Sequence, residues 1–156
     1  MDRLSKAEIK TLTREYIMDS FLLRGCMAEN KKAGAVQYTA ISLMGSDKRL
    51  AAIYGSRGGA ASLWIKEDAW ERLRPDYEPG DIRIEDVSLF QRGFQWAVHF
   101  DDHHDTNIEK IVDVAVEVGK ERWERIVKRR EDDERRALAR VEKEKEMASR
   151  KKDPFA

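Results

Sequence analysis

The last third of the sequence, from Thr106 to about Arg150, contains no proline and only one glycine, Gly119. Because proline breaks helices and glycine weakens their interiors, this uninterrupted stretch predicts a single helix. Its roughly 45 residues would span on the order of 65 Å at ~1.5 Å per residue. A globular domain can fold against only part of so long a helix, so we expect the remainder to protrude.

The first half of this helix is amphipathic. The segment Thr106-Asn107-Ile108-Glu109 matches a capping box, in which the threonine and glutamate side chains satisfy free N–H groups of the first turn. The apolar residues after it fall on one face at about 100° per residue. They are Ile108, Ile111, Val112, Ala115, Val116, Val118, Trp123 and Ile126. We predict that this face packs on a core, and that Gly119 marks a close approach of another backbone.

From Lys128 onward the apolar stripe ends. The same spacing continues through Glu131, Glu134, Leu138, Val141, Lys145 and Ala148, so half of this seam is charged. A stable coiled coil needs an apolar seam over three or four heptads, whereas i,i+4 charge pairs such as Glu131–Arg135 stabilise a solitary helix. Two interpretations follow: a solvated helical tail, or a helix that binds a partner protein through Leu138 and Val141.

The length of 156 residues, 41% of them hydrophobic, predicts one folded domain. We expect a globular α+β domain at residues 1–130 and a charged helical extension at residues 131–156. The 30 basic and 30 acidic side chains cancel. The strongly basic surface typical of nucleic-acid-binding proteins is therefore not indicated, which makes nucleic acid an unfavoured partner.

Cys26 is the only cysteine in the sequence. An internal disulfide needs two cysteines, so a reducing compartment is expected. The sequence contains no signal-peptide pattern and no apolar run of membrane-spanning length. These features predict a cytoplasmic protein without a membrane partner.

Before the long helix, apolar periodicity and turn residues predict two helices and five strands, with a loop after the first helix. We expect a helix at 6–23 that starts with a Ser5–Glu8 capping box, a loop at 30–34, strands at 35–44, 49–56 and 60–66, a short helix at 68–74, and strands at 82–90 and 94–100. Within 82–90, Ile82 and Ile84 alternate out of phase with Val87 and Leu89. This change of phase predicts a β-bulge near Glu85.

These elements predict an α+β fold in the order α-βββ-α-ββ-α, with an antiparallel five-stranded sheet and helices packed across one face. Over residues 5–130 this order resembles that of class I type III secretion chaperones. It also resembles the OB-fold, in which a helix lies between strands three and four. Both resemblances concern the order of elements and imply a fold rather than an activity.

All three histidines lie in the segment His99-Phe100-Asp101-Asp102-His103-His104-Asp105. Imidazole and carboxylate groups suit zinc, manganese or iron, so His99, Asp101 and His103 are candidate metal ligands and a metal-dependent hydrolase is one hypothesis. The His104-Asp105 pair resembles the HD phosphohydrolases, whose distant histidine ligand this sequence lacks. An acidic approach to the long helix explains the same residues, and no cofactor is expected.

No nucleophile with a matching base is evident. Every histidine lies in one short segment, so a Ser/His/acid arrangement is not predicted, and Cys26 follows a helix end rather than a helix start. The segment Gly55-Ser56-Arg57-Gly58-Gly59 lacks the lysine and Ser/Thr of a phosphate-binding loop. It predicts a hairpin tip that presents Arg57.

We therefore expect a non-enzymatic interaction protein that acts as an adaptor, regulator or inhibitor, binds a partner protein and associates into a homodimer. The predicted contact residues are Trp64 on the sheet face, an exposed Trp70 on the short helix, Arg57, Leu138 and Val141. The alternative is an OB-like binder of single-stranded nucleic acid, in which exposed rings stack bases and arginines contact phosphates.

Overall fold

A computed structural model describes residues 3–90 and 93–152 of the chain. The chain divides into two compact units, Met1–Lys120 and Glu121–Ala156, which are described separately. The boundary between the units lies within the last helix.

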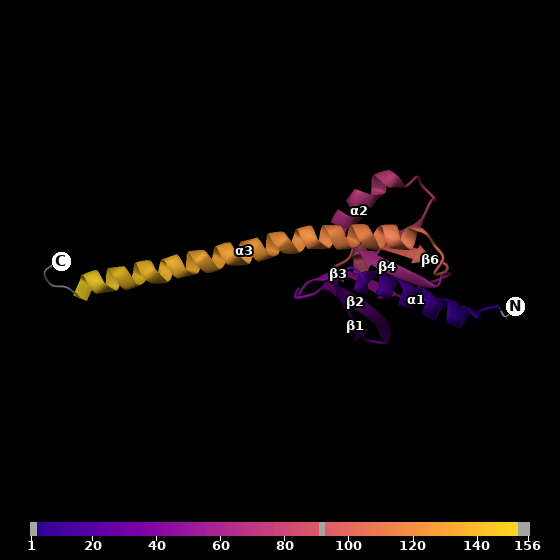
Figure 1. Cartoon of the computed structure of the whole chain (residues 1–156), viewed down its shortest axis with the longest axis horizontal. Helices are drawn as coiled ribbons and strands as arrows, with labels where there is room; N and C mark the ends of the chain where they lie inside the picture. The colour runs from indigo at the N-terminus through magenta and orange to yellow at the C-terminus, as the bar shows by residue number, and fades with distance from the viewer. Residues whose placement is uncertain (1–2, 91–92, 153–156) are drawn as a thin grey trace. The chain divides into compact units, whose positions relative to one another are not determined.

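The fold is α+β, as predicted, and it contains a long C-terminal helix (Figure 1). The helices are α1 (Lys6–Leu22), α2 (Glu67–Leu73) and α3 (Asn107–Lys152), with short 3₁₀ helices η1 (Arg74–Asp76) and η2 (Ser88–Phe90). The strands are β1 (Cys26–Ala33), β2 (Val36–Leu43), β3 (Arg49–Tyr54), β4 (Ala61–Ile65), β5 (Arg83–Asp86) and β6 (Trp96–Phe100).

The sheet has six strands in the described residues, and the prediction of five is wrong. Its order is β1-β2-β3-β4-β6-β5, and every neighbouring pair is antiparallel. Strand β6, which comes last in the sequence, therefore lies between β4 and β5, and β5 forms one edge of the sheet.

The additional strand is β1, part of which we predicted as a loop at 30–34. It pairs with β2 along eight residues, from Cys26 opposite Leu43 to Ala33 opposite Val36. The two-residue connection contains Gly34 at φ 63°, a left-handed conformation that glycine adopts without steric cost. Four consecutive polar residues, Glu29 to Lys32, occupy β1, which an edge strand tolerates, so its sequence lacks the apolar alternation of an inner strand.

The bulge predicted near Glu85 is also wrong. Strand β5 pairs in regular register with β6, from Arg83 opposite His99 to Asp86 opposite Trp96. The strand then ends, because the Asp86 carboxylate accepts hydrogen bonds from the backbone N–H and the hydroxyl of Ser88. This turn into η2 produces the change of phase that resembled a bulge.

One face of the sheet packs against α1 and the N-terminal part of α3. The largest fully buried side chains of this core include Ile17 and Phe21 from α1, Ile108 and Ile111 from α3, and Ile41, Ile53, Leu63, Val98 and Phe100 from the strands. The two helices are also linked, because Tyr16 of α1 donates a hydrogen bond to Glu109 of α3, and Arg24, which follows α1, pairs with Asp113 at 2.6 Å. The prediction that both helices cover one face agrees with these contacts.

Two helix starts can be compared with their predictions. At α1 both hydrogen bonds of the Ser5–Glu8 capping box are present. At α3 the carboxylate of Asp105 accepts the N–H of Asn107. Glu109 instead contacts Tyr16 of α1 and Arg24, which follows α1, so the capping box predicted at Thr106 is replaced by a tertiary contact.

Gly119 marks a close approach, as predicted, although the neighbour is a side chain. A Cβ atom at this position would lie 3.1 Å from the Cβ of Leu50. Glycine therefore allows α3 to lie close to β3 at this point.

The second unit consists of the continuation of α3. From Lys128 to Arg150 every side chain except that of Asp132 is exposed. Near the start of this unit the guanidinium of Arg130 lies 5.3 Å from the ring centre of Trp123. Among the described residues, α3 included, no helix has the length and apolar character needed to cross a membrane.

Truncation after Arg130 is expected to leave the first unit as stable as before. The removed side chains are exposed, so their loss uncovers little apolar surface. The melting temperature should fall by less than about 2 °C, which corresponds to well under ~1 kcal/mol. Thermal unfolding followed by circular dichroism measures this, and a fall of more than about 5 °C would contradict the exposure of residues 131–150.

Candidate functional site

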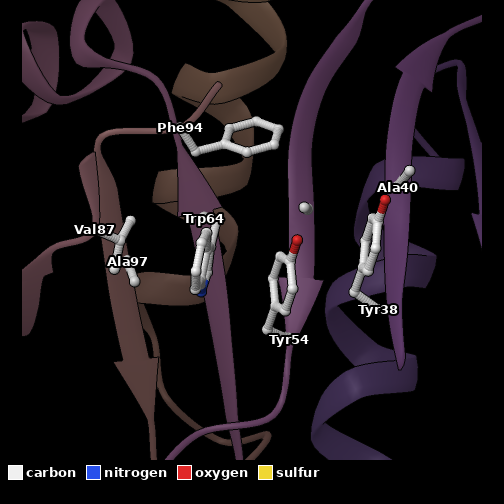
Figure 2. Packing of buried hydrophobic residues seen from close by; sticks show 8 residues of the cluster. Tyr38, Ala40, Tyr54, Trp64, Val87, Phe94 and Ala97 are labelled. Carbon is white, nitrogen blue, oxygen red and sulfur yellow. The ribbon is translucent and has the colours of Figure 1, made fainter. Parts of the chain in front are cut away.

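The face of the sheet opposite α1 and α3 carries a row of aromatic rings (Figure 2). Tyr38, Tyr54 and Trp64 stand side by side on β2, β3 and β4, with ring centres 4.8 Å and 4.1 Å apart. At one end, Arg49 lies over the Tyr38 ring and donates a hydrogen bond to its hydroxyl at 2.9 Å. The rings form a buried cluster with Ala40, Ala52, Val87, Phe94 and Ala97.

Trp64 is only 9% exposed within this cluster. Its indole N–H donates to the hydroxyl of Ser62 at 3.1 Å, and Phe90 packs against its ring. Trp64 therefore does not form an open contact surface on the sheet. The OB-like hypothesis needs exposed rings, and the three rings of the row are buried.

Trp70 is 8% exposed, so the prediction of an exposed tryptophan on the short helix is wrong. Its ring packs against Trp96 of β6 and Tyr77, at centroid distances of 5.8 and 6.5 Å. One side of Trp70 lines a groove of about 480 Å³ between α2 and β5, together with Tyr77, Pro79 and Ile84. The groove makes Trp70 part of a recessed apolar surface rather than a protruding one.

Arg57, Leu138 and Val141 are exposed, in agreement with the positions predicted for them. Arg57 lies in the turn between β3 and β4. Leu138 and Val141 are 66% and 46% exposed on the second unit. These three side chains remain accessible to a partner.

The structure separates the three candidate metal ligands. Asp101 forms an ion pair with Arg83 at 3.3 Å, and the ring of His103 lies against that of His104. The side chain of His99 instead contacts Ser56 and Glu85. Within residues 3–90 and 93–152, no cluster of three or more His, Cys, Asp or Glu residues is suited to holding a metal ion.

His99 instead joins a serine and a glutamate. Its Nδ1 atom lies 2.6 Å from the hydroxyl oxygen of Ser56, and its Nε2 atom lies 3.2 Å from a carboxylate oxygen of Glu85. The side chain of His99 is 15% exposed, whereas Glu85 is more than half exposed. A hydroxyl, an imidazole and a carboxylate therefore form one hydrogen-bonded chain, here called the Ser56–His99–Glu85 chain.

The strand register explains why these three residues meet. On β5, Glu85 lies opposite Ala97, and His99 is two residues beyond Ala97 on β6, so both side chains point to the same face. On the other side of β6, His99 lies opposite Ser62 of β4. The loop that joins β3 to β4 then brings Ser56 to the ring.

Sequence reasoning missed this site because it considered histidines and their partners only within one segment. Ser56 and His99 are 43 positions apart, and Glu85 and His99 are 14 apart. Only the β4-β6-β5 order brings them together, and no sequence signal identifies that order.

Gly59 makes room for the serine. A Cβ atom at position 59 would lie 2.8 Å from the Ser56 hydroxyl oxygen and 2.5 Å from a guanidinium nitrogen of Arg83. Arg83 also donates a hydrogen bond to the carbonyl of Gly58 at 3.3 Å. The loop is therefore held against β5, with the Ser56 hydroxyl directed at His99.

Cys26 differs from the partly exposed Ser56 because it is buried. Its thiol is buried, and burial raises its pKa above the ordinary value because the thiolate is poorly solvated there. A protonated, buried thiol is a poor nucleophile, so Cys26 serves as a small buried side chain of the core.

Two regions of the chain thus carry unexplained features: the Ser56–His99–Glu85 chain in the first unit and the exposed helix in the second. No protein-family model, curated protein or solved structure matches this chain.

Proposed function

We propose that the protein is an interaction protein that self-associates through the second unit, where α3 of one copy pairs antiparallel with α3 of another. The observation that carries the proposal is the self-complementary seam of this helix. The seam consists of Glu131, Glu134, Leu138, Val141, Lys145 and Ala148, all of which are exposed.

A long exposed helix needs a source of stability. Ordering each backbone residue costs roughly 1–2 kcal/mol, and from Lys128 to Arg150 no side chain is buried to offset this cost. Charge pairs at i,i+4 such as Asp132–Arg136 return only about 0.2–0.5 kcal/mol each. Pairing with another helix would supply apolar burial that the isolated helix lacks.

Antiparallel pairing of two copies matches the seam to itself. When the centre lies between Leu138 and Val141, the Leu138 side chain of each copy meets Val141 of the other. One helical turn away on each side, Glu134 meets Lys145 of the second copy. Each charged side chain of the seam then faces either an opposite charge or an alanine of the second copy. Glu131, for example, faces Ala148.

The flank of the seam supports the same orientation. Arg135 and Glu142 are seven residues apart and lie on one side of the apolar pair. In the antiparallel arrangement each Arg135 comes beside Glu142 of the second copy. Parallel pairing in register would instead place Glu134 against Glu134 and Lys145 against Lys145, which is unfavourable.

Self-association of this kind would serve an adaptor or regulatory role. A dimer carries two copies of the first unit, and a partner with two sites binds both because the second contact is intramolecular. Four apolar side chains at the centre form a small interface, so we expect weak association that increases at high local concentration.

A charge exchange tests the orientation. Lys145→Glu turns both Glu134–Lys145 contacts of the dimer into like-charge contacts and is expected to weaken association about tenfold. Adding Glu134→Lys restores opposite charges and should restore association. Sedimentation equilibrium over a wide concentration range measures each dissociation constant.

Matched variants separate the seam from the rest of the helix. The double variant Leu138→Ser, Val141→Ser should abolish association. The control double variant Ala139→Ser, Met147→Ser changes two residues outside the seam and should associate normally. A wild-type chain that stays monomeric at high concentration would disprove the proposal. A double charge variant that fails to recover would disprove the antiparallel orientation.

A further inference from the structure

We propose that Ser56 is a nucleophile, activated by His99, that accepts the acyl group of an ester. This inference concerns the first unit alone and is independent of self-association through α3. It assigns a chemical activity to the Ser56–His99–Glu85 chain, whereas the sequence predicted a protein without one.

The direction of the hydrogen bonds carries the argument. An ionised carboxylate only accepts hydrogen bonds, so the Glu85 contact places the ring proton of neutral His99 on Nε2. The lone pair is then on Nδ1, where it accepts the hydroxyl proton of Ser56 at 2.6 Å. A nucleophile that contacts a base, with the base held by a third group, is the arrangement that activates serine.

The two ring nitrogens exchange the roles they have in serine proteases, where the serine contacts Nε2. The chemistry is equivalent, because either nitrogen of imidazole is basic in the tautomer that leaves it unprotonated. In this protein the carboxylate determines that tautomer, so Glu85 is a positioning residue and does not itself contact the acyl group.

The serine is accessible to a substrate. Ser56 is partly exposed, and its neighbours Gly55 and Gly58 are exposed glycines without side chains to obstruct an approaching carbonyl group. The hydroxyl also keeps its position, because the chain from Gly58 is held to Arg83. An unhindered ester in solution can therefore reach a hydroxyl that is already oriented toward its base.

The reaction proceeds in two balanced steps. The Ser56 oxygen forms a bond to the acyl carbon while its proton moves to Nδ1 of His99. The bond from the acyl carbon to the alcohol oxygen then breaks, and His99 returns the proton to the departing alcohol. In the second step His99 takes a proton from water, whose oxygen bonds to the acyl carbon. The bond from the acyl carbon to the Ser56 oxygen then breaks, and His99 returns the proton to that oxygen, which releases the carboxylic acid and restores the Ser56 hydroxyl.

The test uses an alkyl fluorophosphonate, which bonds to activated serines and releases fluoride, on the full-length protein. Intact-mass and peptide mass spectrometry should find one adduct, located on Ser56 and absent in Ser56→Ala. Burst release of nitrophenol from p-nitrophenyl acetate should parallel this labelling. Ser46→Ala, which removes a hydroxyl from a turn between β2 and β3, is the matched control and should label normally.

Two further variants test the base and its positioning residue. His99→Gln should slow labelling by about 10²-fold or more, the contribution typical of a general base. Glu85→Gln should slow it by at least about tenfold, because an amide can donate to Nε2 and favour the wrong tautomer. Glu85 is largely exposed, so this variant keeps the fold, which circular dichroism verifies.

Three results would overturn the proposal. These are no adduct after prolonged exposure to millimolar reagent, labelling of Ser56 that is equally fast in His99→Gln, and labelling spread over exposed serines such as Ser46. Any of them would mean that the Ser56–His99–Glu85 chain only fastens the loop to the sheet.

Discussion

Ile111→Asp is expected to unfold the first unit. Ile111 is fully buried on the face of α3 that packs against the sheet. An ionised carboxylate there would lose its hydration without gaining a partner, at a cost of several kcal/mol. Because a domain of this size is stable by only about 5–15 kcal/mol, most of the folded population should be lost.

Urea unfolding followed by tryptophan fluorescence and far-UV circular dichroism measures this effect. Lys120→Asp is the matched control, because Lys120 lies on an exposed part of the same helix and should change stability by less than about 0.5 kcal/mol. An Ile111→Asp protein with a normal unfolding midpoint would show that this face of α3 does not pack against the sheet.

Trp64→Ala should destabilise the first unit by about 3–5 kcal/mol, the range for removal of a large buried ring. The substitution removes the ring that stacks on Tyr54 and leaves the hydroxyl of Ser62 without the indole donor. It also opens a cavity beside Phe94 in the buried cluster. Chemical denaturation should therefore show a lower midpoint with an unchanged slope.

Phe90→Ala is the control for Trp64→Ala. The Phe90 ring contacts Trp64 but is 57% exposed, so its removal should cost much less. If Trp64→Ala were neutral for stability and only weakened binding to another molecule, Trp64 would be a contact residue, as the sequence suggested. An equal loss in both variants would also contradict the burial of the row.

Several parts of this fold were predictable because local sequence determines them. The Ser5–Glu8 capping box lies within one turn of helix, so neighbouring residues alone decide it. The alternation of Trp96, Val98 and Phe100 identified β6 for a similar reason, since Val98 and Phe100 pack into the core on one face of that strand. The stripe on the first half of α3 likewise showed which residues would pack, Ile111 among them.

Strand β1 was missed because its signal depends on its neighbours. Met27, Glu29 and Lys31 occupy an edge strand, where one side pairs with β2 and the other is exposed. Such a strand is held by backbone hydrogen bonds and needs no apolar pattern of its own. From sequence it therefore resembled a polar loop.

The burial of Trp70 and the Ser56–His99–Glu85 chain were missed for a different reason. Trp70 is buried because Trp96 and Tyr77 pack against it, and both belong to other elements. The serine, histidine and glutamate meet only once β6 is placed between β4 and β5. Side chains that come together through the sheet order leave no spacing pattern in the sequence.

The two outer strands of the sheet have a consequence for solubility. Within residues 3–90 and 93–152, β1 and β5 each pair with a strand on one side only, so the other edge of each can add a strand from another molecule and start aggregation. A chain with 30 basic and 30 acidic side chains has no net charge to keep copies apart. Charged side chains on the two edge strands keep other strands away instead. They are Lys31 and Lys32 on β1 and Arg83, Glu85 and Asp86 on β5. They oppose edge-to-edge pairing of two sheets even at a pH where the whole molecule is neutral.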